Sequence, residues 1–327
     1  MRLLQHNSKG EIRLTREYVG NDVPPYAILS HTWGAEEVSF KDLMDVTGQD
    51  KLGYDKIRFC GKQALRDGLL YFWVDTCCID KSNSTELQEA FNYMYRWYRD
   101  AAKCYVYLSD VSRPASDAND NSGRQQWMPA FRNSRWFTRG WTLQELIAPA
   151  SIEFFSKEGT KLGNKSSLEE PIRETTGIPP DALRGSPLPN FSVSQRMSWI
   201  KRRNTTRDED KAYSLFGIFD VQMPLLYGEG REKAFKRLQE EIDKVSKSKL
   251  SAPITYQPKC FKCSFLYVTN LDIMPTTPTA TNACGEYGHY ANDVHCYDCG
   301  KFGHYANEVH CYECGEYGHY AKDCPLR

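Results

Sequence analysis

The stretch YAILSHTWG, residues 26–34, decides how the front of this chain folds. It opens on a short run rich in aromatic and aliphatic residues, which is typical of a buried strand. Similar runs follow at 71–75 (YFWVD), 104–108 (CYVYL) and 152–155 (IEFF). Helical patterns, with apolar residues three and four positions apart, separate them at 54–68 and 84–101. This alternation predicts an α/β fold with a mostly parallel sheet and helices on both faces.

The composition limits what the protein can bind. Its 327 residues include 42 basic and 42 acidic side chains, so no net field attracts nucleic acid or a membrane surface. The longest apolar run, LLYFWV at 69–74, is far shorter than a membrane span, and the first residues lack a signal-peptide pattern. We therefore expect a soluble protein with no membrane contact, located in the cytoplasm, with the nucleus as the alternative.

The chain divides into four parts by composition. We predict an α/β domain at 1–156 and a loop-and-helix extension of it at 157–245, in which 157–193 is loop. A flexible linker is predicted at 246–283 and a set of small cysteine-rich repeats at 284–327. The Gly228-x-Gly230 pattern is interpreted as a turn that starts a helix, because no βαβ unit surrounds it.

Polar residues follow two of the predicted strands. Ser30, His31 and Trp33 lie at the end of the first, and Asp75 lies at the end of the second. In open parallel sheets the ligand crevice is found beyond the carboxyl ends of the strands, so these residues are candidates for a substrate pocket. The alternative for Asp75 is a helix cap.

The helix predicted at 139–149 (RGWTLQELIAP) carries an unusual carboxylate. Glu145 lies one turn beyond Trp141, on or beside the face that Trp141 buries. A buried carboxylate is costly unless another group pairs with it. Two interpretations stay open: a structural ion pair with Arg135 or Arg139, and a site residue.

Four blocks of sequence together resemble the fungal heterokaryon incompatibility (HET) domain family. They are YAILSHTWG, WVDTCCIDK, RGWTLQELIAP and TTRDEDKAYSLFGIFDVQMPLLYGEG, and the resemblance covers roughly residues 1–240. The family is associated with nonself recognition and cell death in fungi. Its domain is similar to Toll/interleukin-1 receptor (TIR) domains, which implies a flavodoxin-like sheet here.

The resemblance also implies a chemistry. TIR domains that cleave NAD carry Trp-Cys-x-x-Glu-Leu on a helix, and residues 141–146 (WTLQEL) resemble this motif with Thr142 in place of the cysteine. Glu145 would then be catalytic, supporting the oxocarbenium-like state of the ribose. The expected substrate pocket comprises Ser30, His31, Trp33, Asp75 and Trp141. The alternatives are a non-enzymatic module that signals by self-association or through a protein partner, and a zinc-dependent nucleic-acid-binding protein.

Cysteines concentrate in the tail. Four of the twelve, including Cys77 and Cys78, lie in the first 250 residues and are interpreted as small buried residues rather than nucleophiles. The other eight lie in 260–324, six of them within a repeat of 15 residues and two, Cys260 and Cys263, as the first half of a further incomplete knuckle. In one copy, 311–324, the spacing is that of a CCHC zinc knuckle, which closes a tetrahedral site. Its predicted zinc ligands are Cys311, Cys314, His319 and Cys324.

The preceding copy is incomplete. Cys296, Cys299 and His304 are in place, but Val309 occupies the fourth ligand position. His310 would complete a weak site only after a one-residue bulge. The tail is therefore an array of degenerate copies with one intact unit.

Zinc knuckles usually bind single-stranded nucleic acid by stacking bases on aromatic rings. Tyr312 and Tyr317 supply such rings in the intact unit. Residues 284–327 nevertheless contain three basic against seven acidic side chains, a net charge of −4. Because affinity for nucleic acid depends on neutralising phosphates, we expect only weak binding.

The ligand count predicts the metal content. The full-length protein should hold about one zinc per chain, and Cys314→Ser should remove it, because partial ligand sets bind far more weakly. Metal analysis of both proteins after dialysis measures this. A stoichiometry of two or three would mean that His310 or His295 completes a site interpreted here as incomplete.

Overall fold

The computed structural model describes residues 1–114 and 123–251. Residues 1–250 form one compact unit, which contains both the predicted α/β domain and its predicted extension. The predicted linker and zinc-knuckle repeats lie outside the described residues, apart from the first positions of the linker.

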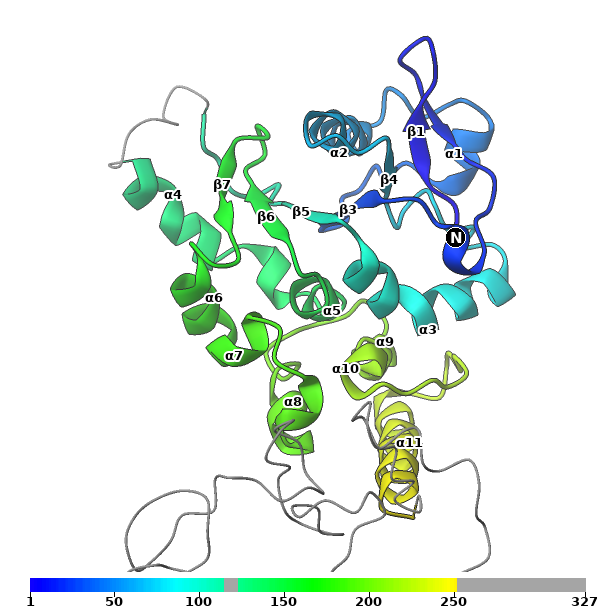
Figure 1. Cartoon of the computed structure of the whole chain (residues 1–327), viewed down its shortest axis with the longest axis vertical. Coiled ribbons are helices and arrows are strands. Elements are labelled where there is room, and N and C mark those ends of the chain that lie inside the picture. Colours follow the sequence, from blue (N-terminus) through cyan, green and yellow to red (C-terminus); the bar gives the residue numbers. More distant parts are fainter. Residues whose placement is uncertain (115–122, 252–327) are drawn as a thin grey trace, which may run out of the picture. The chain divides into compact units, whose positions relative to one another are not determined.

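A seven-stranded sheet, in the order β2-β1-β4-β3-β5-β6-β7, forms the centre of the described unit (Figure 1). The expected α/β fold with a mostly parallel sheet is confirmed. The strands are β1 (Leu4–His6), β2 (Ile12–Leu14), β3 (Tyr26–His31), β4 (Tyr71–Trp73), β5 (Lys103–Tyr107), β6 (Ile152–Phe155) and β7 (Lys161–Asn164). The longer helices are α2 (Tyr54–Arg66), α3 (Ser84–Asp100), α4 (Gly123–Arg132) and α11 (Arg231–Ser251). The shorter ones are α1 (Phe40–Met44), α5 (Thr142–Ile147), α6 (Glu169–Thr176), α7 (Pro180–Leu183), α8 (Val193–Ser198), α9 (Asp210–Tyr213) and α10 (Phe216–Phe219). Three-residue and four-residue 3-10 turns occupy η1 (Gly20–Asp22), η3 (Arg135–Thr138) and η4 (Leu188–Asn190).

The four predicted strands are the four parallel ones. β3 pairs with β4 on one side and β5 on the other, and β6 pairs with β5. The antiparallel strands β1, β2 and β7, which extend the two edges, were not predicted. Unlike the equally short β4 and β6, they are not mostly apolar runs rich in aromatic residues, so the sequence does not mark them as strands.

β3 is the central strand of the seven, and all six of its residues are buried. Such continuous burial is expected where helices cover both faces of a sheet. Figure 1 shows α2 on one face of the sheet and α3 and α5 on the other. Alternate residues of β3 therefore face different helices.

The segment 157–193, predicted as loop, contains regular structure, so that prediction was wrong. It forms β7, α6 and α7. The apolar residues that hold these elements in the core, Leu162, Leu168, Ile172 and Leu183, are nearly fully buried. Leu168 and Ile172 are four residues apart, which is a helical spacing, but α6 and α7 are only eight and four residues long and lie in a sequence rich in Gly, Ser and Pro.

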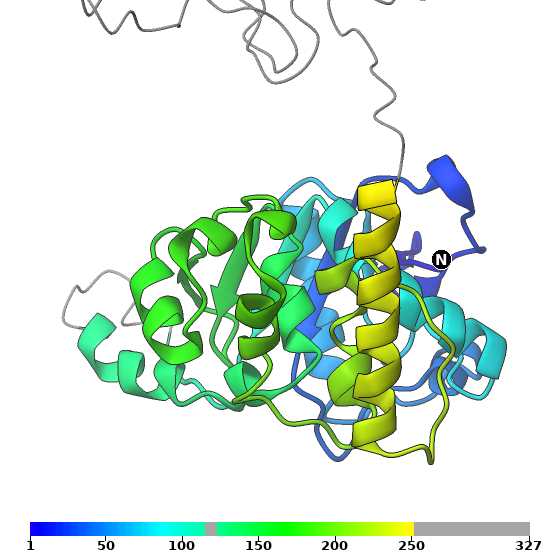
Figure 2. The ribbon, with the colours of Figure 1, turned by 90° about the horizontal axis from the view of Figure 1, so that it is seen from below.

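The helical part of the predicted extension, after residue 193, is present as α8, α9, α10 and α11. Figure 2, which views the unit from below, shows α11 running across this side of the molecule. α10 packs on α3, joining the extension to the α/β domain. No helix within the described ranges is long and apolar enough to cross a membrane.

The contact between α10 and α3 depends on a glycine. A Cβ atom added at Gly217 would lie 2.0 Å from the Cβ atom of Tyr95. Gly217→Ala should therefore separate the two helices and cost about 2–4 kcal/mol of unfolding free energy. Urea denaturation measures the loss. Gly34→Ala is the matched control, because its nearest contact would be 3.6 Å away, at the end of the Glu37 side chain. Equal effects of the two changes would contradict the packing argument.

Candidate functional site

Glu145 is tied to the central strand through Ser30. The Ser30 hydroxyl donates a hydrogen bond of 2.5 Å to Oε2 of Glu145. The indole Nε1 of Trp136, in η3, donates to the same hydroxyl at 2.7 Å. Glu145 is 6% exposed and Ser30 is fully buried. The three side chains form a hydrogen-bonded row between β3, η3 and α5.

The environment of Glu145 favours its neutral form. Burial raises the pKa of Glu145 to about 8, and the nearby charge of Asp75 adds to the effect, although the hydrogen bond from Ser30 opposes it. At neutral pH most molecules therefore carry a protonated Glu145. A carboxyl group with its pKa near neutrality suits proton transfer, and such groups often mark functional sites.

Neither expected ion-pair partner contacts Glu145. Arg135 lies 3.7 Å from Asp110, and Arg139 contacts Thr206 at 3.5 Å. The cation that acts on Glu145 is Arg203, whose charge lowers the pKa of the carboxyl. Arg203 is itself buried and donates to Oγ1 of Thr142 at 2.7 Å. The structural interpretation of Glu145 as a direct salt bridge with Arg135 or Arg139 is therefore wrong.

His31, Asp75 and Trp33 form a second polar group. Oδ1 of Asp75 lies 2.9 Å from Nε2 of His31, and Oδ2 accepts a 2.7 Å hydrogen bond from the Trp33 indole. Although burial would raise the pKa of Asp75, the charges of His31 and Lys81 hold it below its ordinary range. Asp75 is not the cap of α3, because Asn83 fills that position.

The candidate pocket residues are divided between the two faces of the sheet. Ser30 faces Glu145, whereas Nδ1 of its neighbour His31 contacts Nζ of Lys56, on α2, at 2.9 Å. Trp141, at the start of α5, packs on Phe91 of α3 with ring centroids 4.4 Å apart. The structure thus joins Ser30 to Glu145 and joins His31 and Trp33 to Asp75. It does not bring all the predicted residues around one cavity.

The cysteines of the α/β domain are buried, as predicted. Cys77 and Cys78 are at most 2% exposed, and burial raises the pKa of the Cys77 thiol. Both nitrogens of His31 are engaged by other side chains, so His31 does not activate Cys77. Over residues 1–114 and 123–251, no group of three or more His, Cys, Asp or Glu side chains is arranged to hold a metal ion.

Several site residues were missed from the sequence. Lys56 is 8% exposed and links His31 to Glu37, at 2.5 Å from Oε1 of Glu37. Lys56 lies on the same side of α2 as the buried Cys60. The sequence could have indicated this, because residues four positions apart share one face of a helix. Trp136 and Arg203 are distant from Ser30 in sequence, and no local pattern connects them.

The Gly228-x-Gly230 turn precedes α11, as interpreted. Both glycines have positive φ angles, of 95° and 81°, which other residues adopt with difficulty. Their N–H groups donate to Oε1 of Glu209 at 2.9 and 3.0 Å. A carboxylate of the chain therefore occupies the position that a phosphate would take in a phosphate-binding loop.

Comparison with known proteins identifies two regions. Residues 26–128 match the family model described as heterokaryon incompatibility protein (HET). This part of the chain is a HET domain. It contains β3, β4, β5 and the loops after them, and therefore the His31 and Asp75 group. Residues 309–326 match the zinc knuckle model, and this range includes the four predicted ligands. Those ligands lie outside the described residues.

A curated relative supports the same assignment. The chain is 65% identical over 246 residues to the vegetative incompatibility protein HET-E-1 of Podospora anserina. The match covers 75% of this chain but only 18% of that protein. No solved structure matches the chain.

The buried Glu145 predicts an unusual pH dependence of stability. The ordinary pKa of a glutamate is 4.5, so between this pH and about 8 the unfolded protein has lost a proton that Glu145 keeps in the folded protein. Stability therefore falls as pH rises through this range. Glu145→Gln removes this penalty, so the variant should gain about 2–4 kcal/mol over the parent at about pH 9 and little at about pH 4.

Urea denaturation at both pH values measures this difference. The control is Glu174→Gln, because Glu174 is a surface partner of Arg132 with a half-exposed side chain. Its effect should be under about 1 kcal/mol. A Glu145→Gln protein that is less stable than the parent at high pH would show that the folded protein depends on the charged carboxylate.

Proposed function

We propose that this HET protein acts in fungal heterokaryon incompatibility, where it contributes to the cell death that follows nonself recognition. The observation that carries this proposal is the 65% identity over 246 residues to a vegetative incompatibility protein. The match of residues 26–128 to the HET model supports it independently. Because the aligned part is 18% of that relative, the shared role is assigned to the domain rather than to the whole relative.

At a finer level, the proposed activity is cleavage of NAD at Glu145. The supporting observation is a carboxyl group with its pKa raised to about 8, hydrogen-bonded to Ser30 near the carboxyl end of β3. The order of the four parallel strands, in which the second strand lies outside the first, is that of flavodoxin-like sheets. This order agrees with the resemblance to TIR domains.

The chemistry requires one carboxylate. The bond between the nicotinamide nitrogen and ribose C1′ breaks, and its electron pair leaves with nicotinamide, which becomes neutral. Positive charge develops on the ribose, where an ionised Glu145 would stabilise it and accept a hydrogen bond from a ribose hydroxyl. Water then adds to C1′ and releases a proton, which Glu145 can accept.

Access to Glu145 is part of this proposal. Its carboxyl is 6% exposed and lies behind the Trp136 indole and Ser30. NAD would reach it only if α5 and η3 moved away from β3. The proposal therefore couples activity to a conformational change, which clustering by a protein partner or by self-association would trigger.

The alternative is a non-enzymatic module that signals by self-association. The burial of Glu145 favours this alternative, because a structural carboxyl needs no route to solvent. The two functions differ in one observable. If the protein cleaves NAD, toxicity on expression is accompanied by a loss of cellular NAD. If it signals by self-association, toxicity occurs while the NAD concentration stays unchanged.

The tail is proposed to bind zinc through its intact knuckle, on the support of the family match at 309–326. The excess of acidic residues in 284–327 favours a structural role or protein contacts over tight binding of single-stranded nucleic acid.

Nicotinamide release by the purified full-length protein tests the enzymatic proposal. The rate should rise about fiftyfold between about pH 6 and 8, as Glu145 with its pKa of about 8 ionises, and level off above about pH 9. Glu145→Gln should abolish release, whereas the surface control Glu174→Gln should retain it. Release that is unchanged in a folded Glu145→Gln protein would refute a catalytic Glu145. Toxicity with no NAD loss at any pH would favour self-association.

A further inference from the structure

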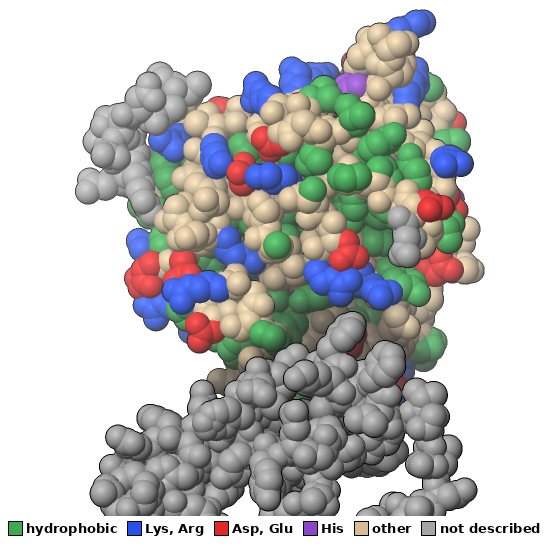
Figure 3. All heavy atoms as spheres, viewed as in Figure 1, with side chains coloured by type: hydrophobic (Ala, Val, Ile, Leu, Met, Phe, Trp, Pro, Cys, Tyr) green, Lys and Arg blue, Asp and Glu red, His purple; other side chains and the backbone are tan. Residues whose placement is uncertain are grey.

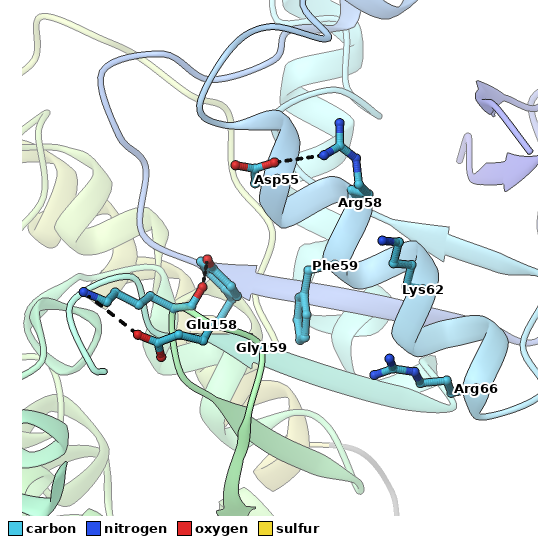
Figure 4. A pocket seen from close by; sticks show the side chains of 9 residues that line it. Asp55, Arg58, Phe59, Lys62, Arg66, Glu158 and Gly159 are labelled. Carbon is cyan, nitrogen blue, oxygen red and sulfur yellow. Dashed lines mark hydrogen bonds and ion pairs between the residues drawn. The ribbon is translucent and has the colours of Figure 1, made fainter. Parts of the chain in front are cut away.

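A basic cleft lies on the face of the sheet opposite Glu145. It is bounded by α2 and by the turn after β6, at residues 157–159, and its volume is about 420 Å³. Figure 4 shows Arg58, Lys62 and Arg66 projecting from α2 along the cleft. Lys157 approaches from the turn. In Figure 3, basic side chains gather along the edge of the molecule that α2 occupies in Figure 1.

Two of these four cations lack an acidic partner. Arg58 is paired with Asp55 at 3.2 Å, and Lys157 lies 4.0 Å from Glu158. Within the described part of the chain, Lys62 makes no recorded hydrogen bond or ion pair, and Arg66 makes only a 3.5 Å contact with Gln63. The lining thus has four positive and two negative side chains, a net charge of +2.

The acidic side chains of the cleft are committed to other partners. Glu158 accepts hydrogen bonds from Ser112 at 2.6 Å and from Ser156 at 2.7 Å. It also accepts from the backbone of Arg113 at 2.9 Å. These bonds fix the Glu158 carboxylate to the turn. Lys62 and Arg66 are therefore free to meet an anion from solution.

Aromatic rings form the floor of the cleft. Phe59 packs on Tyr107 and Phe155, with ring centroids 5.2 and 5.0 Å away. The Tyr107 hydroxyl donates to the Lys157 carbonyl at 2.5 Å, which fixes the ring against the turn. Gly159 lets the turn approach Phe59, because an added Cβ atom would lie 3.0 Å from the ring. The apolar floor is thus held in place from both sides.

The cleft is located where parallel sheets bind ligands. Tyr107 is the last residue of β5, and residues 157–159 follow the end of β6, so both lie at the carboxyl edge of the sheet. The chain order reverses between β3 and β5, and the cleft lies beside this point, at the end of β5 and the turn after β6. Phe155 packs on Phe59, which lines the cleft, whereas its neighbour Phe154 packs on Trp136 beside Glu145. The cleft and Glu145 are therefore on opposite faces.

We propose that this cleft binds a small molecule that carries a diphosphate group. Lys62 and Arg66 are four residues apart on one helix face, a rise of about 6 Å, so each can contact one end of a diphosphate. The volume is in the range of small-molecule sites, and a planar group attached to the diphosphate would rest on Phe59 and Tyr107. The diphosphate is the common feature, and its source is either inorganic pyrophosphate or a nucleoside diphosphate.

Calorimetric titration of the full-length protein at low salt tests the proposal, with pyrophosphate and ADP as probes. We expect both to bind, and the double variant Lys62→Ala, Arg66→Ala to weaken binding by about tenfold or more. ADP binding tighter than pyrophosphate would show that the aromatic floor contacts the base. Equal affinities would assign the site to the diphosphate alone. Both outcomes support the proposal.

The matched control is Lys233→Ala, Lys236→Ala on α11, which removes the same charge from exposed positions. α11 and α2 lie at opposite ends of the unit in Figure 1. Absence of binding at about 1 mM probe, or equal weakening in both double variants, would overturn the proposal. Glu145→Gln should leave binding unchanged, so the outcome is independent of the proposed NAD chemistry.

Discussion

The row of hydrogen bonds from Trp136 to Ser30 to Glu145 is the interaction on which the centre of the molecule depends. It places two polar side chains inside a sheet whose central strand is fully buried. An unpaired carboxyl in that position would cost several kcal/mol, so the hydroxyl and the proton on Glu145 are both needed. The row also fixes η3 and α5 against β3.

The alternation of β3 separates two chemical environments. On the α5 side, Ser30 holds a neutral, buried Glu145; on the α2 side, His31 joins Asp75 and Lys56 in a charged network. The two groups still influence each other, because the charge of Asp75 raises the pKa of Glu145. A change in the protonation or position of Asp75 therefore changes the pKa of Glu145. This coupling is a physical route by which binding at the outer group could alter the state of Glu145.

The functions proposed here use different parts of the same sheet. Glu145 is enclosed and would need a movement of α5, whereas the basic cleft beside α2 is open and has a rigid aromatic floor. A preformed site binds its ligand without a free-energy cost for ordering its residues. Binding at the enclosed Glu145 carries the additional free-energy cost of opening the structure. This protein resembles an incompatibility factor, whose activity must stay off until recognition occurs. A buried Glu145 that becomes accessible only after a conformational change agrees with such control.

The sequence alone determined the parallel strands, because each is a short apolar run between amphipathic helices and its burial on both faces requires that composition. It also indicated Glu145 as unusual, since a carboxylate one turn beyond the apolar Trp141 departs from the amphipathic pattern of the helix. Only the tertiary structure decided what Glu145 contacts. Ser30 and Trp136 lie 115 and 9 residues away in the chain, and Arg203 acts from 58 residues beyond it. The elements within 157–193 and the basic cleft likewise depend on contacts between segments that are distant in the sequence. The local spacing of apolar residues does not predict such contacts. Local propensity selects strands and helices, whereas the partners of a buried polar group are selected by packing across the whole unit.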